Sequence, residues 1–83
     1  MSTVRLLIDC GNTAIKIAVA RGSVLTTFQR LPPQRDSLDA VLRASDDASE
    51  AVLLPGAEAT TRAVRAWWAQ AGRGRPLIAF GDE

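Results

Sequence analysis

The sequence of 83 residues has little cysteine, little net charge and no long apolar run, and each of these scarcities argues against a class of protein. Its single cysteine, Cys10, cannot form an internal disulfide, which fits a reducing compartment. Ten Lys and Arg against nine Asp and Glu leave a formal charge of +1. Charge therefore gives no reason to expect a nucleic-acid or membrane partner. No apolar run approaches the roughly 18–20 residues that a transmembrane helix needs.

The amino terminus lacks the pattern of a secretory leader. Residues 1–5 contain no basic stretch followed by an apolar core and a small-residue cleavage site. We therefore expect a cytoplasmic location. A chain of this length buries only about 60–65% of its unfolded surface, so we expect one small domain of modest stability. An apolar content of 47% is ample for its core.

Lys16 is the only lysine, and the other nine of the ten Lys and Arg residues are arginines. It lies in the segment LLIDCGNTAIKIAVA, residues 6–20, where two apolar runs flank the pentapeptide DCGNT. A hairpin needs Gly and Asn at its corner. It needs neither a carboxylate at the end of the incoming strand nor a lysine three residues after the corner. These two extra residues raise the question of whether the turn holds a phosphate.

Hydrophobic patterns predict five strands and two helices. The strands are expected at 3–10, 14–20, 24–31, 51–54 and 76–80, and the helices from Asp36 or Ser37 to about 44 and at 57–71. In the second strand Ile15, Ile17 and Val19 should share one face, and in the third Val24, Thr26 and Phe28 should do so.

The predicted order β-β-β-α-β-α-β indicates an α/β protein with a mixed five-stranded sheet. Two short turns join the first three strands into an antiparallel meander, and right-handed crossovers place the later strands parallel to the first. This is the ribonuclease H-like arrangement, which is also the half-domain of the sugar kinase, Hsp70 and actin superfamily. Other small α+β folds use the same elements. We find no internal repeat or linker that would divide residues 1–83 into two domains.

The residues of the turn suit a phosphate. Gly11 lets the backbone approach an anion closely, and the amide of Asn12 and the hydroxyl of Thr13 can donate hydrogen bonds. Asp9 repels a phosphate but can orient a divalent cation that bridges phosphate oxygens, and Lys16 supplies positive charge. From these residues alone an ordinary hairpin, with Asp9 and Asn12 as turn formers and Lys16 at an edge, is slightly favoured over a phosphate site, because hairpins with Gly and Asx residues are abundant.

The stretch IDCGNTAIK closely resembles the amino-terminal phosphate-binding motif of type III pantothenate kinases, the family that includes the Bvg accessory factor-like proteins. That motif is Asp-x-Gly-Asn-Thr/Ser, followed after two residues by Lys. The later stretch AVLLP, residues 51–55, is similar to the buried fourth strand of that family. The motif is specific, whereas the rest of the chain matches in element order and apolar pattern.

The resemblance implies ATP-dependent phosphorylation of pantothenate, the first step of coenzyme A biosynthesis. It implies a homodimer of two-half-domain subunits that uses Mg²⁺ and a monovalent cation such as K⁺ or NH₄⁺. Asp9, Gly11, Asn12, Thr13 and Lys16 would bind the nucleotide phosphates, and Asp9 would also serve the metal.

The chain departs from this family in its extent. The family's Gly-x-Asp-Arg segment, which supplies the catalytic base and contacts pantothenate, has no counterpart here. The terminal FGDE lacks the arginine, so we do not assign that role to Asp82 and name no catalytic residue. We expect the amino-terminal half alone, without its second half-domain and inactive by itself. Two alternatives stay open: a non-catalytic association module, or the half-domain of another kinase of the superfamily with a different acceptor.

Three further features favour structural roles. Cys10 should be a small buried filler, and Trp67 should belong to the core. Trp68 cannot share the helix face of Trp67 and is expected at the rim, where a partner could cover it. Four arginines around the second helix are expected to form a solvated face: Arg62, Arg65, Arg73 and Arg75.

Overall fold

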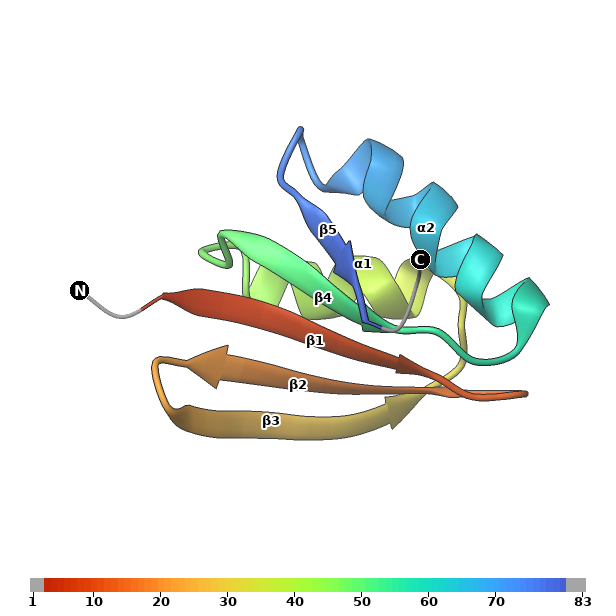
Figure 1. Ribbon diagram of the computed structural model, residues 1–83, viewed down its shortest axis with the longest axis horizontal. Coiled ribbons are helices and arrows are strands. Elements are labelled where there is room, and N and C mark those ends of the chain that lie inside the picture. Colours follow the sequence, from red (N-terminus) through yellow and green to blue (C-terminus); the bar gives the residue numbers. More distant parts are fainter. Residues whose placement is uncertain (1–2, 81–83) are drawn as a thin grey trace.

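A computed structural model, which describes residues 3–80, contains five strands and two helices in the predicted order (Figure 1). They are β1 (Val4–Cys10), β2 (Ile15–Arg21), β3 (Val24–Leu31), α1 (Arg35–Ala44), β4 (Glu50–Leu54), α2 (Glu58–Ala71) and β5 (Leu77–Ala79). The predicted element types are confirmed, and their bounds shift by a residue or two. Among the described residues, neither helix is long and apolar enough to cross a membrane.

The strands form one mixed sheet in the order β3-β2-β1-β4-β5. The meander pairs β1 with β2 and β2 with β3 in antiparallel fashion, while β4 is parallel to both β1 and β5. The predicted parallel placement of the later strands is therefore confirmed. The carboxyl end of β1 and the amino end of α2 lie at the same end of the sheet (Figure 1).

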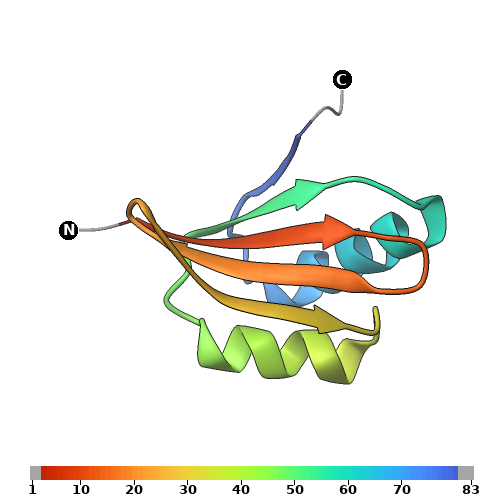
Figure 2. The same cartoon turned by 90° about the horizontal axis from the view of Figure 1, so that it is seen from below.

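Both helices cover the same face of the sheet, which we call the helix face (Figure 2). Ile15, Ile17 and Val19 of β2 are buried there, as the alternation predicted. The core continues through residues from both helices, the neighbouring strands and the loop before β4: Leu6, Ile8, Cys10, Leu38, Val41, Leu42, Ala48, Ala51, Leu53, Val64, Trp67 and Trp68. One contiguous core on one side of the sheet thus holds the fold together.

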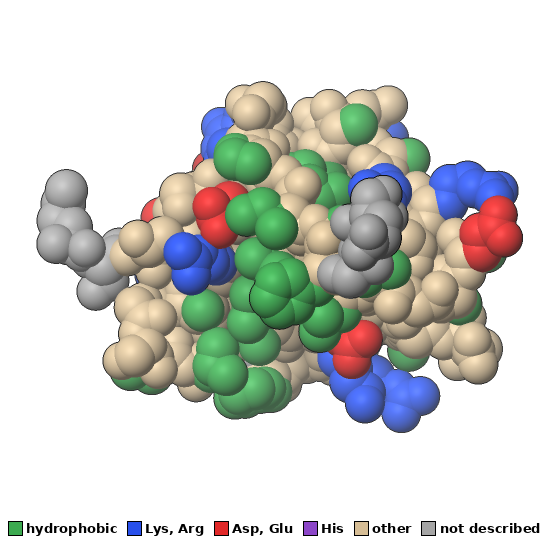
Figure 3. All heavy atoms as spheres, viewed as in Figure 1, with side chains coloured by type: hydrophobic (Ala, Val, Ile, Leu, Met, Phe, Trp, Pro, Cys, Tyr) green, Lys and Arg blue, Asp and Glu red, His purple; other side chains and the backbone are tan. Residues whose placement is uncertain are grey.

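The opposite side of the sheet, which we call the open face, is not covered by either helix. Leu54 and Ile78 are each 43% exposed there, and Phe80 is 64% exposed. Hydrophobic side chains gather near the middle of the view in Figure 3, over the strands. An apolar cluster that faces water is uncommon on a monomeric protein and is typical of a contact surface.

A bulge in β3 changes which residues face each side of the sheet. Counting back from the β2–β3 turn would pair Ile17 with Phe28, but the register shifts between Ile17 and Val19, so that Ile17 pairs with Gln29. Phe28 therefore does not share the face of Thr26, and its ring is 73% exposed. The prediction for this side chain is wrong because one extra residue reverses the alternation that follows it.

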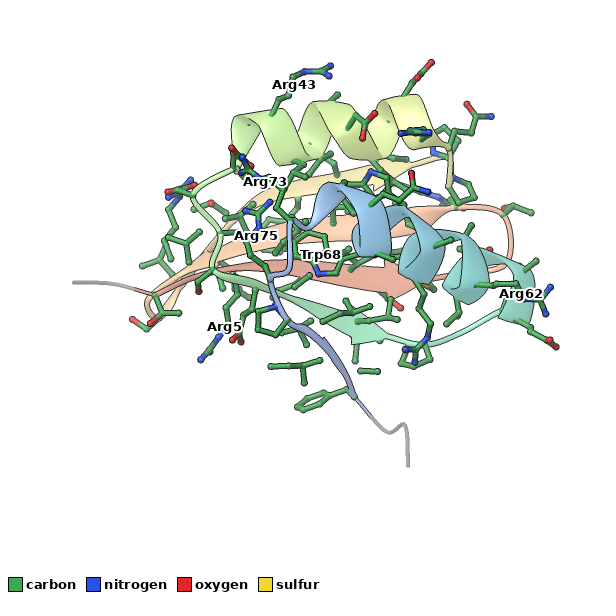
Figure 4. The ribbon with its side chains drawn as sticks, turned by 90° about the horizontal axis from the view of Figure 1, so that it is seen from above. Arg5, Arg43, Arg62, Trp68, Arg73 and Arg75 are labelled. Carbon is green, nitrogen blue, oxygen red and sulfur yellow. The ribbon has the colours of Figure 1, made fainter. Side chains whose placement is uncertain are left out.

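Trp68 lies in the core and not at the rim, so that prediction is also wrong. Its indole Nε1 donates a hydrogen bond of 2.9 Å to the carbonyl oxygen of Arg75. The guanidinium of Arg75 lies 5.2 Å from the centre of the indole ring. Gly72 makes room for this ring, since a Cβ there would lie 2.7 Å from it. The segment after α2 covers Trp68, and no partner is needed (Figure 4).

The four arginines around α2 do not form one solvated face. The side chain of Arg75 is largely buried and donates to the carbonyl oxygens of Gly72 and Ala48 at 2.7 and 2.9 Å. Arg73 reaches Asp46 at 2.6 Å, and Arg62 pairs with Glu58 on the surface of the helix. Arg75 therefore fastens the end of α2 to the loop before β4.

Candidate functional site

The turn between β1 and β2 is closed by one backbone hydrogen bond. The N–H of Gly11 donates to the carbonyl oxygen of Ala14 at 2.9 Å. A Cβ at Gly11 would lie 2.8 Å from that oxygen, so a glycine fits this close approach best. Within residues 3–80, the N–H groups of Asn12, Thr13 and Ala14 have no hydrogen-bond acceptor. Three neighbouring donors are thus available to an anion.

The start of α2 supports the turn from behind. At Gly56 an added Cβ would lie 1.7 Å from the carbonyl oxygen of Cys10, which shows how closely the two backbones meet. The hydroxyl of Thr60 donates to the carbonyl oxygen of Asn12 at 3.3 Å, and the N–H of Gly56 donates to the Thr61 hydroxyl at 3.1 Å. The position of the turn therefore depends on the packing of α2.

The turn borders a cavity of about 350 Å³, which we call the turn hollow. All five residues that the sequence singled out line it together: Asp9, Gly11, Asn12, Thr13 and Lys16. Ala14 and Arg30 complete the lining. No local sequence pattern indicates Arg30, because its place depends on the bulge in β3.

Three charged residues form a row across the strands at the turn hollow. Asp9 of β1 pairs in register with Lys16 of β2, and Lys16 pairs with Arg30 of β3. All three are exposed and lie on the open face. One carboxylate beside two cations gives the row a net positive charge, which suits a polyanion that carries a metal ion at one end.

No protein-family model and no curated protein matches the sequence. Among solved structures, the chain is similar to YeaZ from Pseudomonas aeruginosa, with a TM-score of 0.64 and 19% identity over 96% of this chain and 44% of that one. The chain has the ribonuclease H-like fold. Its element order is that of the half-domain found in actin and Hsp70, as the sequence predicted.

A second structure with this ribonuclease H-like fold is described as an uncharacterised protein with similarity to peptidase YeaZ from Pseudomonas aeruginosa. Its TM-score is 0.63 and its identity is 16%, over 96% of this chain and 44% of that chain. The chain therefore spans less than half the length of the structures that it matches. Structural similarity at identities this low shows the fold alone, so the chemistry has to be inferred from the site.

The donor set of this half-domain fits a metal only in part. Asp9 is the one carboxylate that lines the turn hollow, and residues 3–80 contain no group of three His, Cys, Asp or Glu that could hold an ion. A cation here would take most of its ligands from phosphate oxygens and water. Mg²⁺ is bound in this way, through one or two carboxylates and a substrate phosphate.

Cys10, next to Asp9, takes no part in the site. Its side chain is buried on the helix face, opposite the open face that carries Asp9. Burial raises the pKa of the Cys10 thiol, because the thiolate loses its hydration, while a hydrogen bond with Thr61 opposes that rise. The neutral thiol is a poor nucleophile, so the prediction of a buried filler is confirmed.

Proposed function

We propose that this chain is the ATP-phosphate-binding half of a type III pantothenate kinase, which phosphorylates pantothenate in the first step of coenzyme A biosynthesis. The observation that carries the proposal is the turn hollow. Five residues that match the family's phosphate-binding motif line it together: Asp9, Gly11, Asn12, Thr13 and Lys16. The ribonuclease H-like fold supports it, since sugar kinases of that superfamily bind ATP between two such half-domains.

In this proposal each residue has a separate task. The N–H groups of Asn12 and Thr13 donate to the oxygens of a phosphoryl group, and Gly11 keeps the backbone close to it. Lys16 compensates negative charge from the neighbouring strand. Asp9 would hold Mg²⁺, which would supply positive charge against the negative charge of the phosphoryl group.

The turn is one side of a clamp. Phosphoryl transfer depends on contacts to the phosphates from several directions and on a positioned acceptor. We therefore assign pantothenate binding, the catalytic base, the monovalent cation (K⁺ or NH₄⁺) and dimer formation to the complete protein and not to residues of this chain. Asp82, the terminal acidic residue considered above, lies outside the described residues.

Titration of the ¹⁵N-labelled chain with MgATP tests the nucleotide site. Amide shifts should change first at Asn12, Thr13 and Ala14. Lys16→Gln and Asp9→Asn should weaken binding by about tenfold, the effect of one charge-assisted contact. Arg43→Gln is a matched control, because Arg43 is exposed on α1 and points away from the sheet (Figure 4). Binding that survives both site variants unchanged would contradict the assignment.

The acceptor is tested separately from the nucleotide. Reading the gene beyond the codon for Glu83 should show a Gly-x-Asp-Arg segment and a second glycine-rich turn. A kinase assay on that longer protein should then show phosphorylation of pantothenate. A continuation without this segment, or phosphorylation of another alcohol, would favour a different kinase of the same superfamily.

The open face supports a second candidate function, a non-catalytic association module. Leu54, Ile78 and Phe80 form an exposed apolar cluster on that face, as expected of a contact surface. Sedimentation velocity over a range of concentrations distinguishes the two candidates. A species that grows with concentration and is unaffected by MgATP favours association. A strict monomer with a response to MgATP favours the kinase half.

A further inference from the structure

The basic side chains of the described chain fall into two groups. Six of them form ion pairs within 4.0 Å: Arg5, Arg21, Arg35, Arg62, Arg73 and Arg75. Arg65 has an interaction as well. Lys16, Arg30 and Arg43 have no carboxylate of a described residue within that distance. Two of these three line the turn hollow, where neither forms an ion pair with a carboxylate of a described residue.

The bulge in β3 is what brings Arg30 to the turn hollow. Without it, the register counted from the β2–β3 turn would place Gln29 beside Lys16. With it, Lys16 pairs with Arg30, and Gln29 lies instead near the helix face, where it lines a groove with Ser37 and Val41 of α1. Bulges often re-aim a side chain next to a functional site. Here the bulge exchanges an uncharged amide for a guanidinium.

The chemistry of Arg30 differs from that of Lys16. A lysine ammonium acts as a compact point charge, whereas a guanidinium presents a planar fork of donors that fits two oxygens of a phosphate or carboxylate at once. Lys16 lies on β2, one of the two strands that the turn joins, and Arg30 lies on β3, one strand further from the turn. A single phosphate on the N–H groups of Asn12 and Thr13 is thus closer in the sheet to Lys16 than to Arg30.

We propose that Arg30 is a second anion-binding side chain of the turn hollow, and that it selects a chain of phosphoryl groups over a single phosphate. The proposal rests on the proposed function, since it takes the turn as the place of the first phosphoryl group. The phosphate chain runs from the turn across β2 toward β3. The end near β3 meets the guanidinium of Arg30, and Asp9 would hold any metal ion that accompanies the other end.

The test uses the 83-residue chain with inorganic phosphate and tripolyphosphate as probes, in the presence of Mg²⁺ and at low salt. Affinities come from ¹⁵N amide shifts in the millimolar range. Arg30→Gln should weaken tripolyphosphate binding by about five- to tenfold and change phosphate binding by no more than about twofold. Arg30→Lys should restore part of the loss, because it keeps the charge and removes the fork.

A swap variant separates position from net charge. Gln29→Arg combined with Arg30→Gln keeps the composition and moves the guanidinium to the other side of the strand; Gln29 and Arg30 are both exposed, so folding should persist. It should bind tripolyphosphate as weakly as Arg30→Gln alone. If the swap variant bound tripolyphosphate as tightly as the wild type, net charge and not the position of the guanidinium would determine binding. That result would overturn the proposal.

The remaining outcomes separate this inference from the function on which it rests. If Lys16→Gln weakens tripolyphosphate binding and Arg30→Gln behaves like the Arg43→Gln control, the turn site stands and the role of Arg30 is wrong. If neither Lys16→Gln nor Arg30→Gln has an effect, both the turn site and the role of Arg30 are wrong. Thermal unfolding followed by circular dichroism, unchanged in each variant, confirms that differences in binding do not come from folding.

Discussion

Neighbouring residues on the two faces of the sheet have different tasks. Cys10 and Leu53 point into the core on the helix face, while Asp9 and Leu54, each directly adjacent in sequence, lie on the open face. The helix face carries the contiguous apolar core, and the open face carries the charged row and the exposed apolar cluster. Stability and ligand chemistry are therefore separated by the two-residue alternation of the strands. Substitutions should show the same separation.

Gly56→Ala should have the largest effect, because Gly56 is where the core and the turn meet. The new Cβ would lie 1.7 Å from the carbonyl oxygen of Cys10, and one of the two backbones has to move. We expect the free energy of unfolding to fall by more than about 4 kcal/mol, which is most of the stability of a small domain. Circular dichroism at increasing temperature measures it.

The matched control is Gly74→Ala. Gly74 has a φ of 79°, and nothing lies within 4 Å of an added Cβ, so this change should add only backbone strain of about 1–2 kcal/mol. Equal melting temperatures for the two variants would show that the backbone around Gly56 adjusts easily. The close contact between Gly56 and the carbonyl of Cys10 would then not be important for stability.

The pair Leu53→Ala and Leu54→Ala tests the two faces directly. Leu53 is fully buried, and its truncation leaves a cavity that should lower the free energy of unfolding by about 2–5 kcal/mol. Leu54 is 43% exposed, and its truncation should change that free energy by less than about 1 kcal/mol. Urea unfolding gives both values. Similar losses would mean that the open face is packed in solution, as self-association predicts.

Arg75→Gln changes a residue just after the end of α2 and should have a smaller effect. Its guanidinium donates to the carbonyl oxygens of Gly72, Asp46 and Ala48, and these lose a charged partner. The expected loss of stability is about 1–3 kcal/mol. Arg73→Gln, which removes an exposed ion pair with Asp46, should change it by no more than about 1 kcal/mol. A larger loss of stability for Arg73→Gln than for Arg75→Gln in urea unfolding would contradict the role of Arg75.

The smallest effect is expected at the exposed pair of Arg21 and Asp47, which lies outside both the core and the turn hollow. The hydrogen bond and charge of Arg21 hold the pKa of Asp47 below its usual range. A depressed carboxyl pKa stabilises the fold above the pKa of the unfolded state, and this stabilisation disappears as pH falls through the folded pKa. The slight difference between wild type and Asp47→Asn in urea should therefore vanish in acid. A difference that persists there would point to another cause.

Much of the fold could be predicted because its elements have local signals. The alternation of Ile15, Ile17 and Val19 defines the buried side of β2, and Gly11 with Asn12 marks the turn that follows β1. The five residues of the motif lie within eight positions of the chain, so any structure that forms this hairpin keeps them near one another.

The missed features depend on distant residues. Arg30 lines the turn hollow because of a bulge that no residue type in the sequence predicts. The same bulge places Phe28 in solvent. Trp68 is buried because Gly72 leaves room for its ring and Arg75 folds back over it. Helical spacing places Trp68 on the flank of α2, but it carries no information on what the chain does after the helix ends.

The contacts behind the turn bear on the thermodynamics of binding. Ordering a free loop costs roughly 1–2 kcal/mol for each residue that becomes fixed. Here Gly56 meets the carbonyl of Cys10 and Thr60 holds the carbonyl of Asn12, so the turn loses this freedom when the chain folds. Binding of an anion to the folded chain therefore costs little further conformational entropy of the turn. For the same reason the site persists only as long as α2 stays packed, and local unfolding of that helix would release the ligand.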